Sequence, residues 1–315
     1  MIPTSIDGTD ITGATIDGTD VTEITVDGQT VFSASQPRIY HFGGNDSGGG
    51  IDDIYEYNPD TDTISTMSAT VPQIVRFGLT EAVDGKIYHV GGGTDEIYEY
   101  DPPTDTISTV SATLPQNVSR GAGAAVDGNM YHFAGQSGSL IDDIYEYDPA
   151  TDTASTMSAT LPQGTRFGQA EAVDGKIYHF GGNDSGGAID DIYEYNPDTD
   201  TISTMSATLP KAVIGASVGV VDDKIYHFGG FSPNNDDILE YDPATDTIST
   251  MSETIPVDIR NTTAAVVGGK IYIFGGQTSS LVDDIYEYDP ATDTISTMSV
   301  TLPKDIEAGR AVAFG

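Results

Sequence analysis

The chain contains no cysteine and no tryptophan, and only 12 of its 315 residues are lysine or arginine. Without cysteine it cannot form disulfides, thiolate metal sites or a thiol nucleophile. Its apolar runs are too short to cross a bilayer. Residues 1–30 lack the basic start and apolar stretch of a secretory signal. We therefore expect neither membrane insertion nor export by that route.

Acidic residues dominate the charge, with 49 Asp and Glu and a formal net charge of −37. Such a surface repels nucleic acid and anionic membranes, so we expect neither as a partner. Regularly placed aromatic residues, 17 Tyr and 10 Phe, argue against disorder. At molar salt the Debye length falls to about 3 Å and self-repulsion largely disappears. We interpret the chain as adapted to very high salt, like proteins of extreme halophiles or their viruses; an ordinary acidic surface is the alternative.

Two short motifs recur six times along the chain. The segment Tyr57–Thr63 (YNPDTDT) returns with its proline at positions 59, 102, 149, 197, 243 and 290, a period of 43 to 48 residues. A double glycine, or its counterpart in the third copy, lies upstream of each copy, first in Ile39–Gly44 (IYHFGG). A fixed period of this length is typical of arrays of small structural units.

Each repeat predicts four short strands, which we name a to d from first to last. In the second copy, Asp84-Gly85 forms a two-residue hairpin turn before the alternating strand 86–90. Strands at 97–100 and 106–109 follow, separated by an Asp-Pro turn. The first copy lacks strand a, and the chain ends in a surplus one at 310–314. We predict that this last strand completes the first sheet and removes an exposed edge.

The double glycine, the Tyr-Asp-Pro turn and the period resemble the kelch-repeat family. The resemblance implies an all-β fold, a six-bladed β-propeller over residues 38–315. Where kelch repeats usually carry a Trp on strand d, this chain has Ile or Ala, as at Ile64 and Ala154. We therefore expect blade packing that is less aromatic and looser.

Residues 1–37 form a separate β-hairpin module with a ten-residue repeat around Asp7-Gly8, Asp17-Gly18 and Asp27-Gly28. A module of this size is too small to bury its own core without help. We predict an anchoring or oligomerisation role, in a homo-oligomer or on another virion or stalk protein; a frayed leader is the alternative. The segment also resembles amino-terminal segments of structural proteins from tailed viruses of halophilic archaea.

Repeated residues offer no catalytic set. His41 and its four counterparts occupy strand b, too far apart to share one zinc ion, so we expect structural histidines and no metal. The Asp52-Asp53 pairs, and Asp60 and Asp62 in the turns, suit calcium through oxygen ligands, but we interpret them as a solvated acidic surface. We predict no cofactor and no catalytic residue, so the protein is not expected to be an enzyme.

Arginines gather in the d–a connections, which share one face of a propeller with the variable b–c loops. In kelch domains arginines at this position line the ligand-binding mouth of the central channel, which the resemblance carries over to Arg76, Arg166 and Arg260, with Arg120 one step away. Two phenylalanines follow these arginines, and two glutamates break the repeat inside strand a. An Arg–Glu pair within each blade is one interpretation; a pocket for a sugar or peptide carboxylate is the other. The binding residues we predict are Arg76, Arg120, Arg166, Arg260, Phe77, Phe167, Glu81 and Glu171.

These features together predict a non-enzymatic attachment or structural protein, such as a tail-fibre component on a virion surface. The d–a/b–c loop face would then contact a host-surface glycan or protein. Two alternatives stay open: a soluble carbohydrate-active enzyme similar to the kelch sialic-acid mutarotases, and a protein-interaction propeller in the cytoplasm of an extreme halophile.

Overall fold

The computed structural model describes residues 5–6, 9–10, 23–26, 29–33, 37–231 and 235–315. The chain divides into two compact units, Met1–Pro37 with Gly315, and Arg38–Phe314. In the described residues no helix is long and apolar enough to cross a membrane.

The first unit contains two short antiparallel pairs. β1 (Ser5–Ile6) pairs with β2 (Thr9–Asp10), and β3 (Glu23–Val26) pairs with β4 (Gln29–Ser33). These pairs flank the first and third Asp-Gly dipeptides of the ten-residue repeat. The second copy, around Asp17-Gly18, lies outside the described residues.

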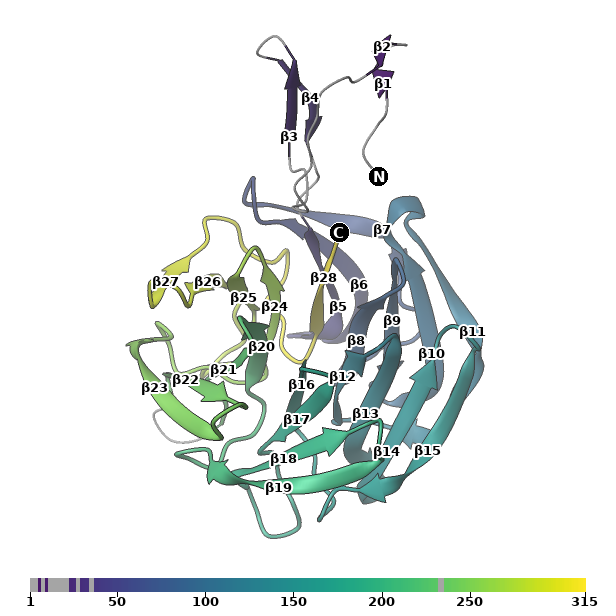
Figure 1. Cartoon of the computed structure of the whole chain (residues 1–315), viewed down its shortest axis with the longest axis vertical. Coiled ribbons are helices and arrows are strands. Elements are labelled where there is room, and N and C mark those ends of the chain that lie inside the picture. The colour runs from purple at the N-terminus through teal and green to yellow at the C-terminus, as the bar shows by residue number, and fades with distance from the viewer. Residues whose placement is uncertain (1–4, 7–8, 11–22, 27–28, 34–36, 232–234) are drawn as a thin grey trace. The chain divides into compact units, whose positions relative to one another are not determined.

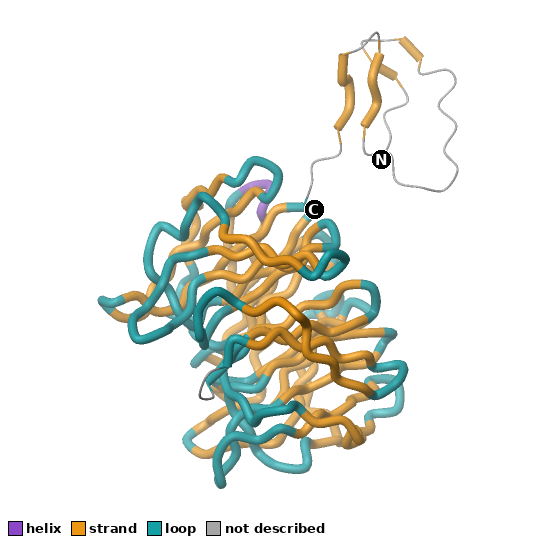
Figure 2. The backbone as a smooth tube through the Cα atoms, turned by 90° about the vertical axis from the view of Figure 1, so that its left-hand side faces the viewer, coloured by secondary structure: helices purple, strands orange, loops and turns teal. Residues whose placement is uncertain are grey.

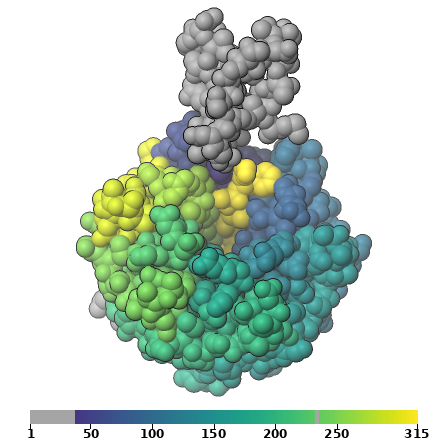
Figure 3. All heavy atoms as spheres, in the orientation of Figure 1, coloured from purple at the N-terminus to yellow at the C-terminus, as the bar shows by residue number. Residues whose placement is uncertain are grey.

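The second unit is built from six four-stranded antiparallel sheets, each one blade of a propeller. In Figure 1 the innermost strands β28, β8, β12, β16, β20 and β24 surround the centre, and in Figure 2 loops and turns join the strands at both ends. The surface in Figure 3 runs once through the colour scale around this centre, so consecutive blades are neighbours. The all-β, six-bladed fold predicted from the repeats is confirmed.

The blades have the following strands, from the innermost outwards. Blade 1 contains β28 (Arg310–Phe314), β5 (Arg38–Asp46), β6 (Gly49–Asn58) and β7 (Thr63–Thr70); blade 2 contains β8 (Gly78–Val83), β9 (Lys86–Gly91), β10 (Thr94–Asp101) and β11 (Thr106–Val118). Blade 3 contains β12 (Ala122–Val126), β13 (Asn129–Ser137), β14 (Ser139–Asp148) and β15 (Thr153–Thr160); blade 4 contains β16 (Gln169–Val173), β17 (Lys176–Phe180), β18 (Asp191–Asn196) and β19 (Thr201–Thr208). Blade 5 contains β20 (Ser217–Val221), β21 (Lys224–Phe228), β22 (Asp237–Asp242) and β23 (Thr247–Thr254); blade 6 contains β24 (Thr263–Val267), β25 (Lys270–Phe274), β26 (Ile285–Asp289) and β27 (Thr294–Thr297). A single 3₁₀ turn in the described residues, η1 (Pro102–Thr104), follows β10.

Blade 1 joins the two ends of the second unit. β28 pairs antiparallel with β5, placing Arg310 opposite Phe42 and Phe314 opposite Arg38. The first repeat therefore obtains its innermost strand from the end of the chain. This pairing satisfies backbone groups that would otherwise form an exposed sheet edge.

Hydrophobic clusters fill the interfaces between neighbouring blades, and tyrosines dominate them. Tyr100 of blade 2 packs edge-on against Tyr40 and Phe42 of blade 1, with ring centroids 5.7 and 5.6 Å apart. Similar aromatic contacts join the other neighbouring blades. Tyr and Phe on strands b and c thus supply aromatic packing between blades, although strand d carries Ile or Ala.

A second connection between blades comes from the turn that follows strand c. Asp105 of blade 2 accepts hydrogen bonds from the backbone N–H groups of Ser68 and Ala69 in blade 1, at 2.7 and 3.2 Å. Asp62 of blade 1 accepts one from the Ser299 N–H of blade 6 at 2.9 Å, which closes the circle. Four more aspartates bind the preceding blade in the same way: Asp152, Asp200, Asp246 and Asp293.

These aspartates therefore correct the interpretation of Asp62 as part of a solvated surface. Desolvation acts to raise the pKa of Asp62, but hydrogen bonds from Ser299 and Tyr57 outweigh it, so the pKa lies below its usual value. Its φ of 48° is left-handed, a conformation that Asp tolerates better than most residues. The backbone of Asp62 thus forms the left-handed turn, and its side chain bonds the neighbouring blade.

Candidate functional site

A closed ring of backbone hydrogen bonds surrounds one end of the central channel. Each d–a connection contributes one residue, whose N–H donates to the C=O of the ring residue in the neighbouring blade at 2.6 to 3.1 Å. The bond from Ala308 to Asn261 and the bond from Phe77 to Ala308 complete the circle. The six members are Phe77, Arg120, Phe167, Gly215, Asn261 and Ala308.

All six ring residues have a left-handed backbone, with φ between 52° and 66°. Glycine and asparagine adopt this conformation readily, whereas a bulky residue such as Phe77 or Phe167 is strained in it. The ring therefore holds two phenylalanines in an unfavourable backbone conformation at the mouth of the channel. Strain of this kind is concentrated at functional sites, where surrounding contacts maintain it.

The two ring phenylalanines lie against each other, with centroids 5.0 Å apart in an edge-to-face arrangement. The guanidinium groups of Arg120 and Arg166 lie over the Phe167 ring, 5.3 and 5.6 Å from its centroid. Both also donate hydrogen bonds to Oε1 of Gln136, at 2.7 and 3.1 Å. Gln136 and Phe167 therefore hold two like charges side by side.

Neighbouring cations affect the pKa of Arg120. Desolvation, followed by the charges of Arg166 and Arg76, lowers the pKa of Arg120 below its ordinary value. The Nε of Arg166 is buried and makes no hydrogen bond within the described residues. An anion placed among these groups would relieve the repulsion and accept the unused hydrogen bonds.

Arg260 occupies a second part of the mouth. Its Nε and Nη2 donate to Oε1 of Gln277 at 3.1 and 2.8 Å, and its guanidinium lies 4.6 Å above the centroid of Phe231. Phe231 is 55% exposed, which is unusual for a large apolar side chain. Together with Val257 and Thr278 these residues line a cavity of about 640 Å³.

A central cavity of about 440 Å³ brings the predicted residues together. Arg76, Arg120 and Arg260 line it with Phe77 and Phe167. Other lining residues, which sequence reasoning missed, are Asn45, Ile214, Phe231, Asn261 and Glu307. Both cavities fall within the roughly 300–1,000 Å³ of ordinary small-ligand sites.

The remaining basic residues differ from these arginines. Arg38 and every one of the six lysines form ion pairs with a carboxylate, as Lys176 does with Glu194 at 2.9 Å. Within the described residues, five arginines form no ion pair with a carboxylate within 4.0 Å: Arg76, Arg120, Arg166, Arg260 and Arg310. Arg76, Arg120 and Arg260 line the central cavity and Arg310 lines the channel, whereas Arg166 lines neither and lies over the ring of Phe167.

Glu81 and Glu171 do not belong to the mouth. They lie on β8 and β16, four residues beyond the ring, and line the channel. The predicted ion pairs with Arg76 and Arg166 do not form in the described structure, because the Phe77–Phe167 layer separates the two levels. The structure therefore divides the predicted set into a mouth group and a channel pair.

Desolvation alone raises the pKa of Glu81 to about 8. The pKa of Glu171 is also raised well above its usual value, first by desolvation and then by the charge of Glu81. Neither carboxylate has a cation within 4.0 Å among the described residues. The two acids, each partly exposed, therefore share a part of the channel in which both cannot easily be ionised.

Arg310 is the channel residue that sequence reasoning missed as a site residue. It lies two positions beyond the ring on β28 and lines the same cavity as the two glutamates. The other arginines precede an a–b turn, which marks their place in the repeat, whereas no such turn follows Arg310 or Glu307 in this sequence. Counting from the preceding strand d could have found both.

The histidines of strand b are buried, with exposed fractions of 1 to 3%. His179 packs against Phe133 of the preceding blade and His227 against Phe180, which is the position between blades expected of structural residues. In the described part of the chain no three His, Asp or Glu side chains gather as a metal site requires.

Comparison with known families identifies the repeats. The profile of the KLHDC2/KLHL20/DRC7 Kelch-repeats domain matches residues 15–182 and 167–313. The chain belongs to the kelch-repeat family. No curated protein matches it significantly. Family membership thus accounts for the propeller fold, while any specific binding or activity depends on the residues of the mouth and channel.

Proposed function

We propose that this kelch propeller is a non-enzymatic binding protein whose mouth recognises an acidic ligand. The observation that carries the proposal is the distribution of basic residues. In a chain with a net charge of −37, the arginines that have no carboxylate partner among the described residues all lie at the mouth and channel. Leaving these guanidinium groups unpaired among so many carboxylates favours a ligand that supplies the anion.

The ligand chemistry follows from the groups around the mouth. Arg76 and Arg260 present planar guanidinium groups suited to a carboxylate or another oxyanion. The exposed ring of Phe231 and the Phe77–Phe167 pair offer apolar faces on which a sugar ring or a peptide side chain can stack. We infer an acidic glycan or a protein segment ending in or rich in carboxylates.

We further propose that the protein acts in attachment, on a virion surface or tail fibre, with residues 1–37 as the anchor. The acidic composition and the separate amino-terminal unit support this setting. The test is copurification of the full chain with virus particles rather than with cytosol. Removing residues 1–37 should leave a folded monomeric propeller that no longer incorporates into particles, and unchanged incorporation would contradict the anchoring role.

Binding at the mouth is tested with an array of acidic glycans, neutral glycans and carboxyl-terminated peptides in molar salt. The Arg76→Ala/Arg166→Ala variant should lose at least about tenfold in affinity for the acidic members, since each guanidinium contributes charge-assisted bonds. Lys86→Ala/Lys176→Ala is the matched control, because it removes two positive charges from the same two blades at ion pairs outside the mouth. Equal losses in both variants would show a general charge effect and refute a site at the mouth.

A carbohydrate-active enzyme is the second candidate, favoured by the raised pKa of the Glu81–Glu171 pair. The pair lines a cavity of about 60 Å³ and an adjoining one of about 270 Å³, both below the roughly 300 Å³ of a typical small-ligand site. This size favours the enzyme less than the larger cavities at the mouth favour binding there. Sugar turnover that disappears in Glu81→Gln would establish the enzyme instead.

A further inference from the structure

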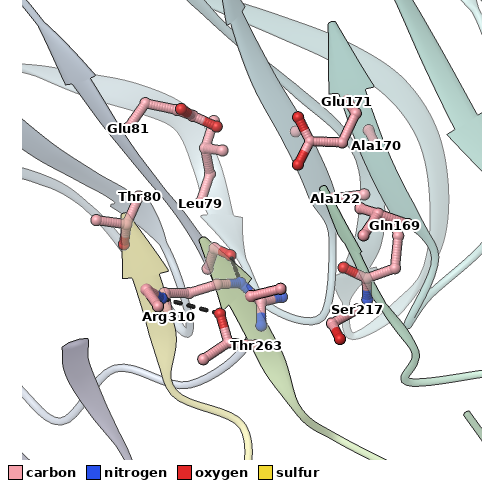
Figure 4. Close-up of a pocket in the computed structure, with 15 residues that line it drawn as sticks. Leu79, Thr80, Glu81, Ala122, Gln169, Ala170, Glu171, Ser217, Thr263 and Arg310 are labelled. Carbon is pink, nitrogen blue, oxygen red and sulfur yellow. Dashed lines mark hydrogen bonds between the residues drawn. The ribbon is translucent and has the colours of Figure 1, made fainter. Parts of the chain in front are cut away.

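The channel contains a second polar cavity, separate from the mouth. Its volume is about 60 Å³, room for about four water molecules. Its walls are small, as at Ala122, Gly123 and Ala264. Figure 4 shows the carboxyl groups of Glu81 and Glu171 toward one end of this space, and the Arg310 guanidinium, Gln169 and Ser217 toward the other.

The hydrogen-bonded ring fixes the relative heights of these groups. Arg310 follows the ring member Ala308 by two residues. Glu81 follows the ring member Phe77 by four residues, and Glu171 follows Phe167 by four. Sheet registers agree, since Arg310 pairs with Phe42, whereas Glu81 and Glu171 pair with Tyr88 and Tyr178. Two residues along a strand correspond to about 6.6–6.8 Å.

The end of the cavity at Arg310 has N–H donors that make no hydrogen bond within the described residues. Arg310 donates from Nε to the carbonyl of Gly78 and from Nη1 to the carbonyl of Gly309 at 3.1 Å. A guanidinium has five N–H groups, so three remain available. Burial lowers the pKa of Arg310 only to about 10, which leaves it a cation at neutral pH. Its guanidinium carbon lies 6.0 Å from the centroid of Phe77, and its charge also acts on the buried His41, His89 and His132.

At the end of the cavity that holds Glu81 and Glu171, no described residue places a cation within 4.0 Å of the carboxyl groups. Glu81 and Glu171 are exceptions among the repeats, since the other blades carry Ala124, Gly219 and Ala265 at this level, or Val312 in blade 1. Two carboxyl groups that lack a cation are costly in this part of the channel. An ammonium group between them would serve both.

This cavity opens away from the mouth. A neighbouring cavity of about 270 Å³ shares Glu81 and Glu171 with it and continues along the strands past Ala82, Gly219 and Ala313, further from the ring. The Phe77–Phe167 pair lies on the opposite side, between the channel and the arginines of the mouth. A small molecule could therefore reach the cavity without passing the mouth.

We propose that the channel binds a small zwitterion of the α-amino acid class, with its carboxylate on Arg310 and its ammonium group between Glu81 and Glu171. The amino nitrogen and carboxyl carbon of such a molecule are about 2.5 Å apart. Charge-assisted hydrogen bonds of about 2.8 Å at each end extend this reach to about 8 Å along a bent path, which is comparable with the backbone offset of about 6.6–6.8 Å between the two levels. Small wall residues such as Ala122, Gly123 and Ala264 leave room for glycine or alanine.

The test is calorimetric titration of the full chain with glycine and L-alanine in molar KCl at neutral pH. Acetate, methylammonium and glycinamide serve as probes that each lack one charge of the zwitterion. Glycine should bind at least about tenfold more tightly than any of these three probes. Acetate binding as tightly as glycine would reveal a simple anion site at Arg310, and absence of glycine binding would equally overturn the proposal.

Variants assign the binding to the two ends of the cavity. Glu81→Gln/Glu171→Gln should lower glycine affinity at least about tenfold and leave acetate binding unchanged, because only the ammonium partner is removed. Glu253→Gln, an exposed glutamate on β23, is the matched control and should bind glycine like the parent. Arg310→Lys should weaken glycine and acetate together, and its unfolding transition shows whether the fold is retained. Glycine binding unaffected by the double Glu variant would contradict the assignment.

Discussion

Acid sensitivity of the propeller should come from its buried histidines, and replacing His132 by isoleucine tests this directly. His132 is 1% exposed, and neither ring nitrogen has a hydrogen-bond partner in the described structure. Desolvation, followed by the charge of Arg310, lowers its pKa to about 4. The sixth repeat already carries Ile273 at the equivalent position, so an isoleucine fits this blade geometry.

The direction of the pH dependence follows from the protonation of His132 in the folded and in the unfolded chain. A histidine with a depressed pKa is neutral in the folded protein, whereas in the unfolded chain it takes up a proton near pH 6.5. Stability is therefore lost as pH falls from about 6.5 toward 4. With pKa values of about 4 and 6.5, His132 costs about 2 kcal/mol of folding stability at pH 5 and almost nothing at pH 7.

The same reasoning covers the other four histidines, whose pKa values are lowered to about 3 or 4 mainly by burial. Together the five would cost about 9 kcal/mol between pH 7 and pH 5, against a typical total of 5–15 kcal/mol. Glu81 and Glu171 act in the opposite direction, because raised pKa values make the folded state bind protons first. They offset part of the loss.

Urea unfolding in molar KCl, followed by circular dichroism at pH 7 and pH 5, measures the effect. Relative to the parent, His132→Ile should gain about 2 kcal/mol between the two pH values, with an unchanged urea dependence. Phe133→Leu, on the same strand, is the control: its cost should be equal at both pH values because no titrating group changes. A His132→Ile difference that is also independent of pH would refute the assignment of a neutral buried imidazole.

Further predictions concern the connections between blades and the surface charge. Asp62→Ala should destabilise the propeller by about 2 kcal/mol in chemical unfolding, since it removes the bond from the Ser299 N–H, while Asp60→Ala in the same turn should change stability by less than about 0.5 kcal/mol. Deleting residues 310–314 should abolish cooperative unfolding, because β5 would lose its inner neighbour; a normal transition would contradict the role of closure. Lowering the salt from about 3 M to about 0.1 M should lower the melting temperature markedly, as the Debye length grows to about 10 Å, and an unchanged melting temperature would argue against adaptation to high salt. Ala308→Gly should leave stability unchanged or raise it by up to about 1 kcal/mol, because the ring requires φ near 62° at this position.

Local chemistry in the sequence determined most of the architecture. Six copies of an Asp-Pro turn and a double glycine predict the number of blades, because each copy encodes one four-stranded unit whose turns depend only on neighbouring residues. The surplus strand at 310–314 indicates how the circle closes, since alternation and the missing first strand are both visible along the chain. Placement of Arg76, Arg166 and Arg260 in the d–a connections follows from the same repeat.

Only the tertiary structure decided which of these groups share an environment. Asp62 reads as an exposed turn residue in sequence, but its bonding partner is 237 residues away in blade 6. Glu81 lies five residues from Arg76, yet the Phe77–Phe167 layer places them at different levels of the channel. Arg310 meets Glu81 and Glu171 in one cavity only because the last strand completes the first blade. Such proximity depends on closing the circle, which no local pattern of residues records.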